Sequence, residues 1–231
     1  MINNIIDQAG RKTIVTGHYG SGKTEFAVSL AMMMVSRSPV SIIDLDIVNP
    51  YFRSQERREL LENNGIAVYG SMYKKEITAE LPALGANIRV PLENSSCRVI
   101  IDAGGNDAGA LVLNQFTKYF TDEDTTVLTV VNANRPDTSD IGGILEHIKA
   151  IERITKLNIS GLVNNTHMLR ETTAADIIHG HKLCMEVCEA TGKTLLCNCY
   201  PEGVVDPDEL DGFSENLMPL GLYMRPTWLD K

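Results

Sequence analysis

The chain has 231 residues, of which 43% are hydrophobic and 22% are charged, and its formal net charge is −9. This composition is that of an ordinary globular protein and excludes a disordered chain. The acidic balance argues against a broad basic surface, so we expect neither nucleic acid nor a membrane as a partner.

Nothing in the sequence predicts export or membrane insertion. The first residues lack the basic start and apolar stretch of an export signal. No apolar run approaches the roughly 20 residues that span a bilayer. The cysteine count is 5, an odd number, which indicates reduced thiols rather than a disulfide framework. We therefore expect a cytoplasmic protein.

Apolar runs of strand length alternate with helix-like stretches along the chain. The expected strands are residues 12–16, 40–45, 66–70, 98–103, 125–132, 159–164 and 193–197. The expected helices are residues 23–36, 54–63, 107–120, 139–155 and 173–190. Between Met72 and Glu93 the pattern is ambiguous, because Pro82 and Pro91 argue against one long helix.

The alternation predicts an α/β fold with a mostly parallel sheet and helices on both faces. Several of the strands are continuously apolar, as parallel strands buried on both faces should be. We expect a single domain over residues 1–231, with a core at about 12–201 and a C-terminal tail at 202–231. Pro219 and Pro226 break this tail, so it does not form the continuous amphipathic helix of a membrane anchor.

The strongest motif follows the first strand. Residues 17–24 read GHYGSGKT and fit the phosphate-loop pattern G-x-x-x-x-G-K-S/T between a strand and a helix. The glycines allow unusual backbone angles, and consecutive N–H groups at the start of the helix can then surround phosphate oxygens. Such a loop uses its Lys on the β- and γ-phosphates and its hydroxyl on Mg²⁺. We expect the nucleotide to contact Gly17, His18, Tyr19, Gly20, Ser21, Gly22, Lys23 and Thr24.

Carboxylates follow two further strands. Asp44 and Asp46 end the run IIDLD, and residues two apart in a strand point to the same face. One of them is a candidate to orient a water for attack on the γ-phosphate. Asp102 ends the run VIID and is suited to anchor Mg²⁺ through its waters. The amide of Gly105, in the same DAGG loop, can approach a γ-phosphate and distinguish a triphosphate from a diphosphate.

In combination, these motifs resemble the SIMIBI class of P-loop NTPases, which have a three-layer α/β/α fold. More narrowly, they resemble its MinD/ParA/CobQ-CobB-type ATPases, including metallocentre-maturation ATPases. The resemblance runs from Lys12 to about Pro201. The phrases DLDIVNPYFRSQE, VNANRPDTSD and GLVNNTHMLRETT also resemble a branch described only as ATP-binding proteins.

The resemblance implies roles for particular residues. Asp46 would be the hydrolytic residue, with Lys23 and Asp102 completing the catalytic set. Thr24, Asp44 and Asp102 would hold Mg²⁺ and its waters, and Asn164 would read the adenine edge. Family members close two subunits around two nucleotides, so the resemblance also implies an ATP-dependent homodimer that acts on a client protein.

The phosphate loop departs from the usual family spelling. His18 occupies the position of a Lys that reaches across the dimer, and Tyr19 stands where Gly is usual. A neutral imidazole donates one hydrogen bond, which is weaker than that of an ammonium. The loop spelling also resembles that of urease and hydrogenase maturation GTPases. Those GTPases carry an N-K-x-D motif whose Asp accepts hydrogen bonds from guanine. At the corresponding residues 164–167 the present chain reads NNTH and has no Asp, so we expect ATP.

Two weaker signals stay open. Cys197 and Cys199 could hold a soft metal or be core residues, and the second is the commoner role of a free Cys in a strand. Arg135 could face the nucleotide and dimer side or lie in solvent.

Three functions fit these observations. The first is a slow ATPase that acts as a nucleotide-dependent switch for a client protein or for metalloenzyme maturation. The second is an ATP-dependent, carboxylate-activating ligase of the dethiobiotin synthetase or cobyrinate-amidation type. The third is a nucleotide-sensing partition or scaffold protein, and the fold class does not choose among them.

Overall fold

The computed structural model describes residues 2–46, 57–70, 81–105, 107–121 and 123–224. Within them lies one sheet of eight parallel strands in the order β3-β2-β4-β1-β5-β6-β7-β8. The strands are β1 Lys12–Thr16, β2 Val40–Asp44, β3 Ile66–Gly70, β4 Arg98–Asp102, β5 Thr125–Val131, β6 Gly161–Asn164, β7 Thr194–Pro201 and β8 Leu217–Leu220.

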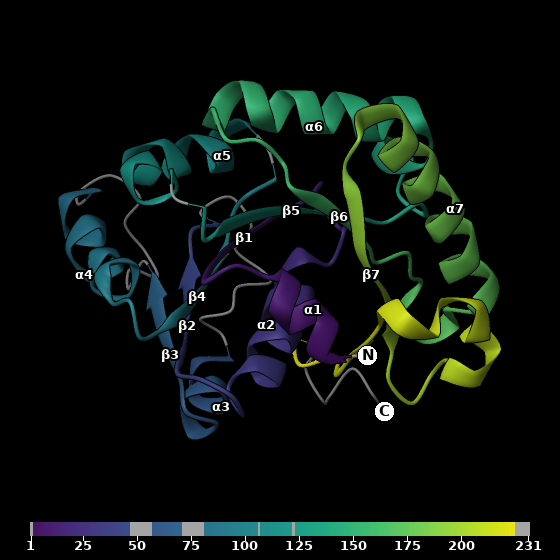
Figure 1. The fold of residues 1–231 in the computed structure, drawn as a ribbon, viewed down its shortest axis with the longest axis horizontal. Helices are drawn as coiled ribbons and strands as arrows, with labels where there is room; N and C mark the ends of the chain where they lie inside the picture. Colours follow the sequence, from purple (N-terminus) through teal and green to yellow (C-terminus); the bar gives the residue numbers. More distant parts are fainter. Residues whose placement is uncertain (1, 47–56, 71–80, 106, 122, 225–231) are drawn as a thin grey trace.

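Helices cover both faces of this sheet. They are α1 Ile2–Gln8, α2 Lys23–Met34, α3 Arg58–Asn63, α4 Leu81–Glu93, α5 Asp107–Leu113, α6 Ile141–Thr155 and α7 Ala174–Thr191. One apolar cluster packs α4 to α7 against one face, and a second packs α1 to α3 against the other. Figure 1 shows α6 and the α1–α2 pair on opposite sides of the central strands. The predicted α/β class, with a parallel sheet between two layers of helices, is confirmed.

The strands β1 and β2 are buried along their whole length, which explains their mostly apolar sequences. Every residue of β1 and of β2 is buried. Because β1 lies between β4 and β5, the carboxyl ends of β1, β2 and β4 meet at one edge of the sheet. That edge is where ligands bind in open α/β sheets.

The helix boundaries follow local signals in the sequence. Thr173 and Asp176 form a capping box at the start of α7, and Gly192 ends it with a left-handed backbone, φ 69°. In the ambiguous segment, α4 contains both prolines: Pro82 is its second residue and Pro91 lies near its end. A proline in the first turn costs no hydrogen bond, because those N–H groups have no helical partner.

Other boundaries differ from the expected ones. The helix expected at 107–120 is α5 followed by a 3₁₀-helix, Asn114–Tyr119. Of the helix expected at 54–63, residues 54–56 lie outside the described part of the chain, and α3 begins at Arg58.

Buried apolar residues also lie outside residues 12–201, while the extent of the domain remains a prediction. Ile5 and Ile6 of α1 are buried in the second cluster, as are Met218 and Leu220 of β8. The strand β8 was not predicted, because its sequence contains a proline. Pro219 is tolerated in β8 because, among the described strands, β8 lies at the edge of the sheet and pairs with β7 on one side. Across the part of the chain that the structure describes, no helix is both long and apolar enough to span a bilayer.

Candidate functional site

The phosphate loop joins the end of β1 to the start of α2. Gly20 and Gly22 have positive φ angles of 76° and 80°, which side chains other than glycine rarely adopt. Gly22 is the residue immediately before α2, and any Cβ there would collide with the Asn165 amide. The glycines are therefore required by backbone conformation and by close packing, as the motif predicted.

The loop lysine is paired with a carboxylate that lies two residues beyond β2. Lys23 Nζ lies 2.7 Å from Asp46 Oδ2, and the two side chains are only 6% and 3% exposed. Asp44 and Asp102 occupy paired positions on β2 and β4, and the Asp46 amide donates to Asp44 Oδ1 at 3.1 Å. The three predicted carboxylates and Lys23 thus converge at one sheet edge.

Burial and charge shift the pKa values in this cluster. Burial alone would lower the pKa of Lys23, but Asp102 and Asp46 outweigh it and hold the pKa above its ordinary value. Burial raises the pKa of Asp102 to about 7, although the Lys23 ammonium opposes this rise. Lys23 is therefore charged near neutral pH, and Asp102 titrates there.

Asp102 and Thr24 fit a Mg²⁺ site built with the nucleotide. Both Asp102 oxygens are buried, and within the described residues no hydrogen bond of ordinary geometry reaches them. The Thr24 hydroxyl is close enough to lower the pKa of Asp102. Mg²⁺ in nucleotide sites keeps several waters and shares its coordination with phosphates, so a hydroxyl and a carboxylate are the side chains such a site would need.

The loop after β4 packs directly on the phosphate loop. A Cβ at Gly105 would overlap the carbonyl group of Gly17, and one at Gly104 would lie 2.7 Å from Gly109 Cα. The two glycines after Asp102 are therefore needed for close backbone approach. The predicted contact of Gly105 with a γ-phosphate remains a prediction, and its position against Gly17 is compatible with it.

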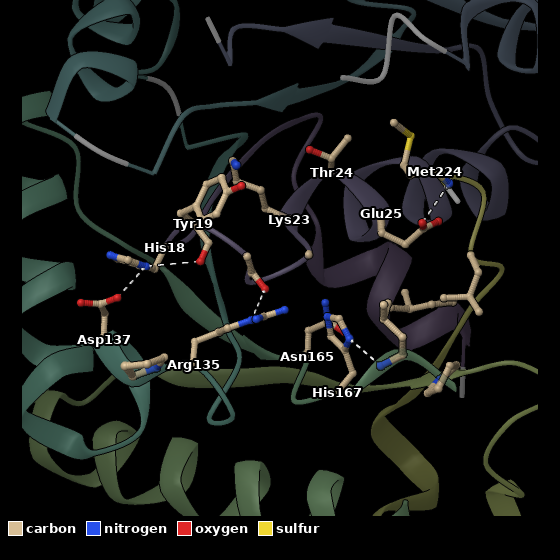
Figure 2. A pocket seen from close by; sticks show the side chains of 17 residues that line it. His18, Tyr19, Lys23, Thr24, Glu25, Arg135, Asp137, Asn165, His167 and Met224 are labelled. Carbon is tan, nitrogen blue, oxygen red and sulfur yellow. Dashed lines mark hydrogen bonds and ion pairs between the residues drawn. The ribbon is translucent and has the colours of Figure 1, made fainter. Parts of the chain in front are cut away.

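A cavity of about 570 Å³ opens beside the phosphate loop (Figure 2). This volume suits a small-molecule ligand. One end is formed by the phosphate loop, the first turn of α2 and the segment that follows β5, and the other by the segment that follows β6 and by the ends of β7 and β8 with the residues after β8. The lining residues are His18, Tyr19, Gly20, Gly22, Lys23, Thr24, Glu25, Arg135, Pro136, Asp137, Asn165, His167, Leu169, Pro201, Leu220, Leu222 and Met224.

Arg135 belongs to this site, which answers the question that the sequence left open. Its Nε donates to Gly20 O at 3.1 Å, so the side chain lies along the phosphate loop (Figure 2). The guanidinium is thereby placed at the phosphate end of the cavity.

Asn164, expected at the adenine edge, does not line the cavity. It is fully buried, and its Nδ2 donates to Ile177 O and to Asn198 Oδ1, both at 2.9 Å. Its Oδ1 accepts from the Thr166 hydroxyl at 2.8 Å. The side chain thus ties β6 to α7 and β7. The next residue, Asn165, lines the cavity in its place and donates from Nδ2 to Ser21 O at 2.8 Å.

His18 and Tyr19 lie at the mouth of the cavity. His18 Nδ1 is 3.6 Å from Asp137 Oδ2, and its ring meets His147 edge to face, with 5.9 Å between the centroids. Burial lowers the pKa of His147 to about 4, so this ring is neutral at pH 7. The Tyr19 side chain is 67% exposed. The role of His18 toward a second subunit remains a prediction.

The C-x-C pair is buried in β7. Cys197 and Cys199 are 0% and 1% exposed, and Cys197 Sγ lies 4.0 Å from Met218 Sδ. Burial raises the pKa of Cys199, which opposes thiolate formation. These contacts are those of core residues.

Glu25, Asn165 and His167 line the cavity but were not among the predicted site residues. Glu25 follows the GKT of the motif by one position, and Asn165 and His167 follow β6 directly. Their position next to recognised motifs was the available signal. Burial lowers the pKa of His167 to about 4, so its ring is neutral at pH 7 and can both donate and accept.

Comparison with known proteins gives structural matches only. No protein-family model matches the chain, and no curated protein matches it. FtsY from Mycoplasma mycoides has a TM-score of 0.54 at 16% identity over 80% of this chain and 57% of that one. FtsY from Thermotoga maritima has a TM-score of 0.54 at 19% identity, over 80% and 59% of the two chains. Signal Recognition Particle 54 kDa protein from Aeropyrum pernix, solved in complex with GDP, has a TM-score of 0.53 at 21% identity, over 81% of this chain and 41% of that one.

These similarities establish the fold. The chain shares its fold with FtsY and with the signal recognition particle protein, which agrees with the fold expected from the motifs and does not single out the MinD/ParA branch. The chain spans 57% and 59% of the length of the two FtsY structures.

Proposed function

We propose that this protein binds Mg·ATP in the cavity beside the phosphate loop and hydrolyses it slowly as a nucleotide-dependent switch. The observation that carries the proposal is the buried Lys23–Asp46 ion pair, 2.7 Å long, at the start of α2. An ammonium held there, at the positive end of a helix and beside a cavity, has the position and charge to bind terminal phosphates.

The same ion pair supports a role for Asp46 in hydrolysis. When phosphates bind Lys23 in place of Asp46, the ion pair is broken and the Asp46 carboxylate can orient a water. That water attacks the γ-phosphorus, the bond from this phosphorus to the bridging oxygen breaks, and ADP and phosphate leave. The Thr24 hydroxyl would ligate Mg²⁺, with Asp44 and Asp102 holding its waters, and the metal would neutralise charge on the β- and γ-phosphates.

The composition of the lining supports adenine as the base. Guanine is usually recognised by a carboxylate that accepts from its ring N–H and amino groups. The carboxylates in the cavity are Glu25, which accepts two backbone N–H groups, and Asp137, which lies beside His18. Asn165 lines the cavity and donates from Nδ2 to Ser21 O, and its amide oxygen is an acceptor for which the amino group of adenine is a suitable donor. GTP is the competing ligand, because a matched structure holds GDP.

The switch itself would act through the loop after β4. Gly105 lies against Gly17, so a γ-phosphate arriving at the phosphate loop would meet this loop directly. We propose that its movement changes the contacts of an ATP-dependent homodimer with a client protein.

Phosphate release from ATP and GTP, measured with purified protein alone, tests this function. We expect slow release from ATP, at least tenfold less from GTP, and a loss of release in Asp46→Asn, on the order of 100-fold or more for removal of a group that positions the attacking water. Strict dependence on an added small carboxylic acid would instead favour a ligase. Binding without release, in the wild type and in Asp46→Asn alike, would favour a nucleotide-sensing scaffold. Mass measurement with and without Mg·ATP tests the dimer.

A further inference from the structure

The C-terminal segment Gly221–Met224 folds back onto the first turn of the phosphate-loop helix. Glu25 Oε1 accepts from the Tyr223 amide at 2.5 Å, and Oε2 accepts from the Met224 amide at 2.9 Å. These contacts join residues 198 and 199 positions apart in the sequence. Both oxygens of one carboxylate thereby bind consecutive backbone amides. Figure 2 shows the contact with Met224.

This carboxylate stands in the nucleotide site itself. Glu25 is two residues beyond Lys23 on α2 and lines the same cavity. Burial raises the pKa of Glu25, whereas the amides of Met224 and Tyr223 and the charge of Arg57 oppose that rise. Hydrogen bonds from N–H groups to a carboxylate are among the stronger ones in proteins, so the contact holds the segment firmly.

The backbone of Gly221–Met224 is also specialised. Leu222 has a φ of 50°, one of three positive values among described residues other than glycine. A Cβ on Gly221 would lie 2.5 Å from the Tyr223 ring. A left-handed leucine persists only where its surroundings hold it, and such positions concentrate at ligand sites.

The side chains held in this way form one wall of the cavity. Leu222 and Met224 line it together with Leu220 and Pro201, while Asn165 and His167 contribute polar groups. An apolar wall with a few polar groups suits a flat heteroaromatic ring. Phosphate-binding groups lie at the other end, so the base of a nucleotide would face this wall.

We propose that Glu25 is a positioning residue that holds Gly221–Met224 as the base-side wall of the nucleotide cavity, so that affinity for a purine ring depends on this carboxylate. The inference rests on the proposed function, because it assigns a part of the same nucleotide site. It assigns to the C-terminal segment a direct role in ligand binding.

Calorimetry with ATP and with inorganic tripolyphosphate, both with Mg²⁺, tests the inference. Tripolyphosphate carries the phosphates without the base, so it reports on the phosphate end alone. We expect Glu25→Ala to weaken ATP binding by about 10- to 100-fold, the range for losing hydrogen bonds to a charged group, and to change tripolyphosphate binding by less than about twofold. Glu25→Gln should lie between, because its amide can accept from only one of the two N–H groups. Glu146→Ala, at an exposed glutamate on α6, is the matched control.

Leu222→Gly provides a second test that leaves the carboxylate in place. It removes the side chain from the wall and relieves the positive φ, so it should keep or raise the thermal stability and still weaken ATP relative to tripolyphosphate. The inference is overturned if both variants retain the wild-type ratio of ATP to tripolyphosphate affinity. It is also overturned if both ligands weaken equally. If the wild type binds neither ligand, the proposed function fails as a whole.

Discussion

Asp46→Asn should lower the stability of the free protein and strengthen its nucleotide binding. The substitution removes the charge that faces Lys23 at 2.7 Å in a buried site. Breaking a buried ion pair costs about 3–5 kcal/mol when no counter-charge remains. Here Asp102 still acts on Lys23, so the loss should be nearer that of one charge-assisted hydrogen bond, about 1.5–3 kcal/mol.

The same substitution removes the competitor of the phosphates. In the wild type, an incoming phosphate must displace Asp46 from Lys23, whereas in Asp46→Asn the ammonium lacks this partner. ATP binding should therefore no longer have to break the Lys23–Asp46 ion pair, whose contribution to stability is about 1.5–3 kcal/mol. The ATP affinity of Asp46→Asn should be tighter by up to about 10- to 100-fold. Hydrolysis should nevertheless be lost, because the group that positions water is gone.

Thermal unfolding with and without Mg·ATP, together with calorimetry, measures both effects. A fall in Tm of about 3–12 °C without nucleotide is expected for a chain of this size, with a smaller deficit when ATP is bound. Asp211→Asn, at an exposed position, is the matched control. An Asp46→Asn protein of wild-type stability, or one that binds ATP more weakly than the wild type, would refute the reasoning.

Three further predictions concern the same site. Because the pKa of Asp102 is raised to about 7, its ionised fraction should rise about tenfold from pH 6 to pH 8, and the Mg²⁺-dependent part of the ATP affinity should rise with it. The free energy of unfolding of the free protein should fall over the same pH range. If Asp102→Asn keeps the full rise in ATP affinity, this prediction is contradicted. Gly105→Ala should cost about 1–3 kcal/mol in chemical denaturation, because its methyl group has no room beside Gly17, and an unchanged midpoint would count against the described loop contact. Asn164→Ala should destabilise the fold by about 1–3 kcal/mol, because it leaves buried hydrogen-bond partners unsatisfied. Asn165→Ala should mainly lower the ATP affinity measured by calorimetry. The reverse pattern would indicate that Asn164 binds the base.

The parts of the site that the sequence predicted are those in which a local pattern fixes the geometry. A glycine-rich loop between a strand and a helix has few possible shapes, so the positions of Gly22 and Lys23 followed from the motif. Strand ends in a parallel sheet meet at one edge, so Asp44, Asp46 and Asp102 were expected together.

The parts that it missed depend on contacts between distant segments. The bond from Glu25 to the backbone near Met224 spans 199 positions and leaves no periodic signal. β8 is short, carries a proline and is held by its pairing with β7 and by the burial of Met218 and Leu220. Asn164 and Asn165 are adjacent, so they point to opposite sides. Only the packing of α7 against β6 decides which one reaches the cavity.

The choice of ATP, the homodimer, the client protein and the extent of the single domain remain predictions. The structural matches share the fold at 16% to 21% identity and leave these assignments open to experiment. Mass measurement and nucleotide competition address the first two directly.

Calorimetric titration of the protein with ATP in the presence of Mg²⁺, compared between the wild type and Lys23→Ala, tests the central claim most directly. The account predicts saturable binding at one site per chain and an affinity about 10- to 100-fold weaker in Lys23→Ala, with Lys149→Ala, an exposed lysine on α6, unchanged. Equal affinities in the wild type and Lys23→Ala, or no heat of binding from any purine nucleotide, would contradict it.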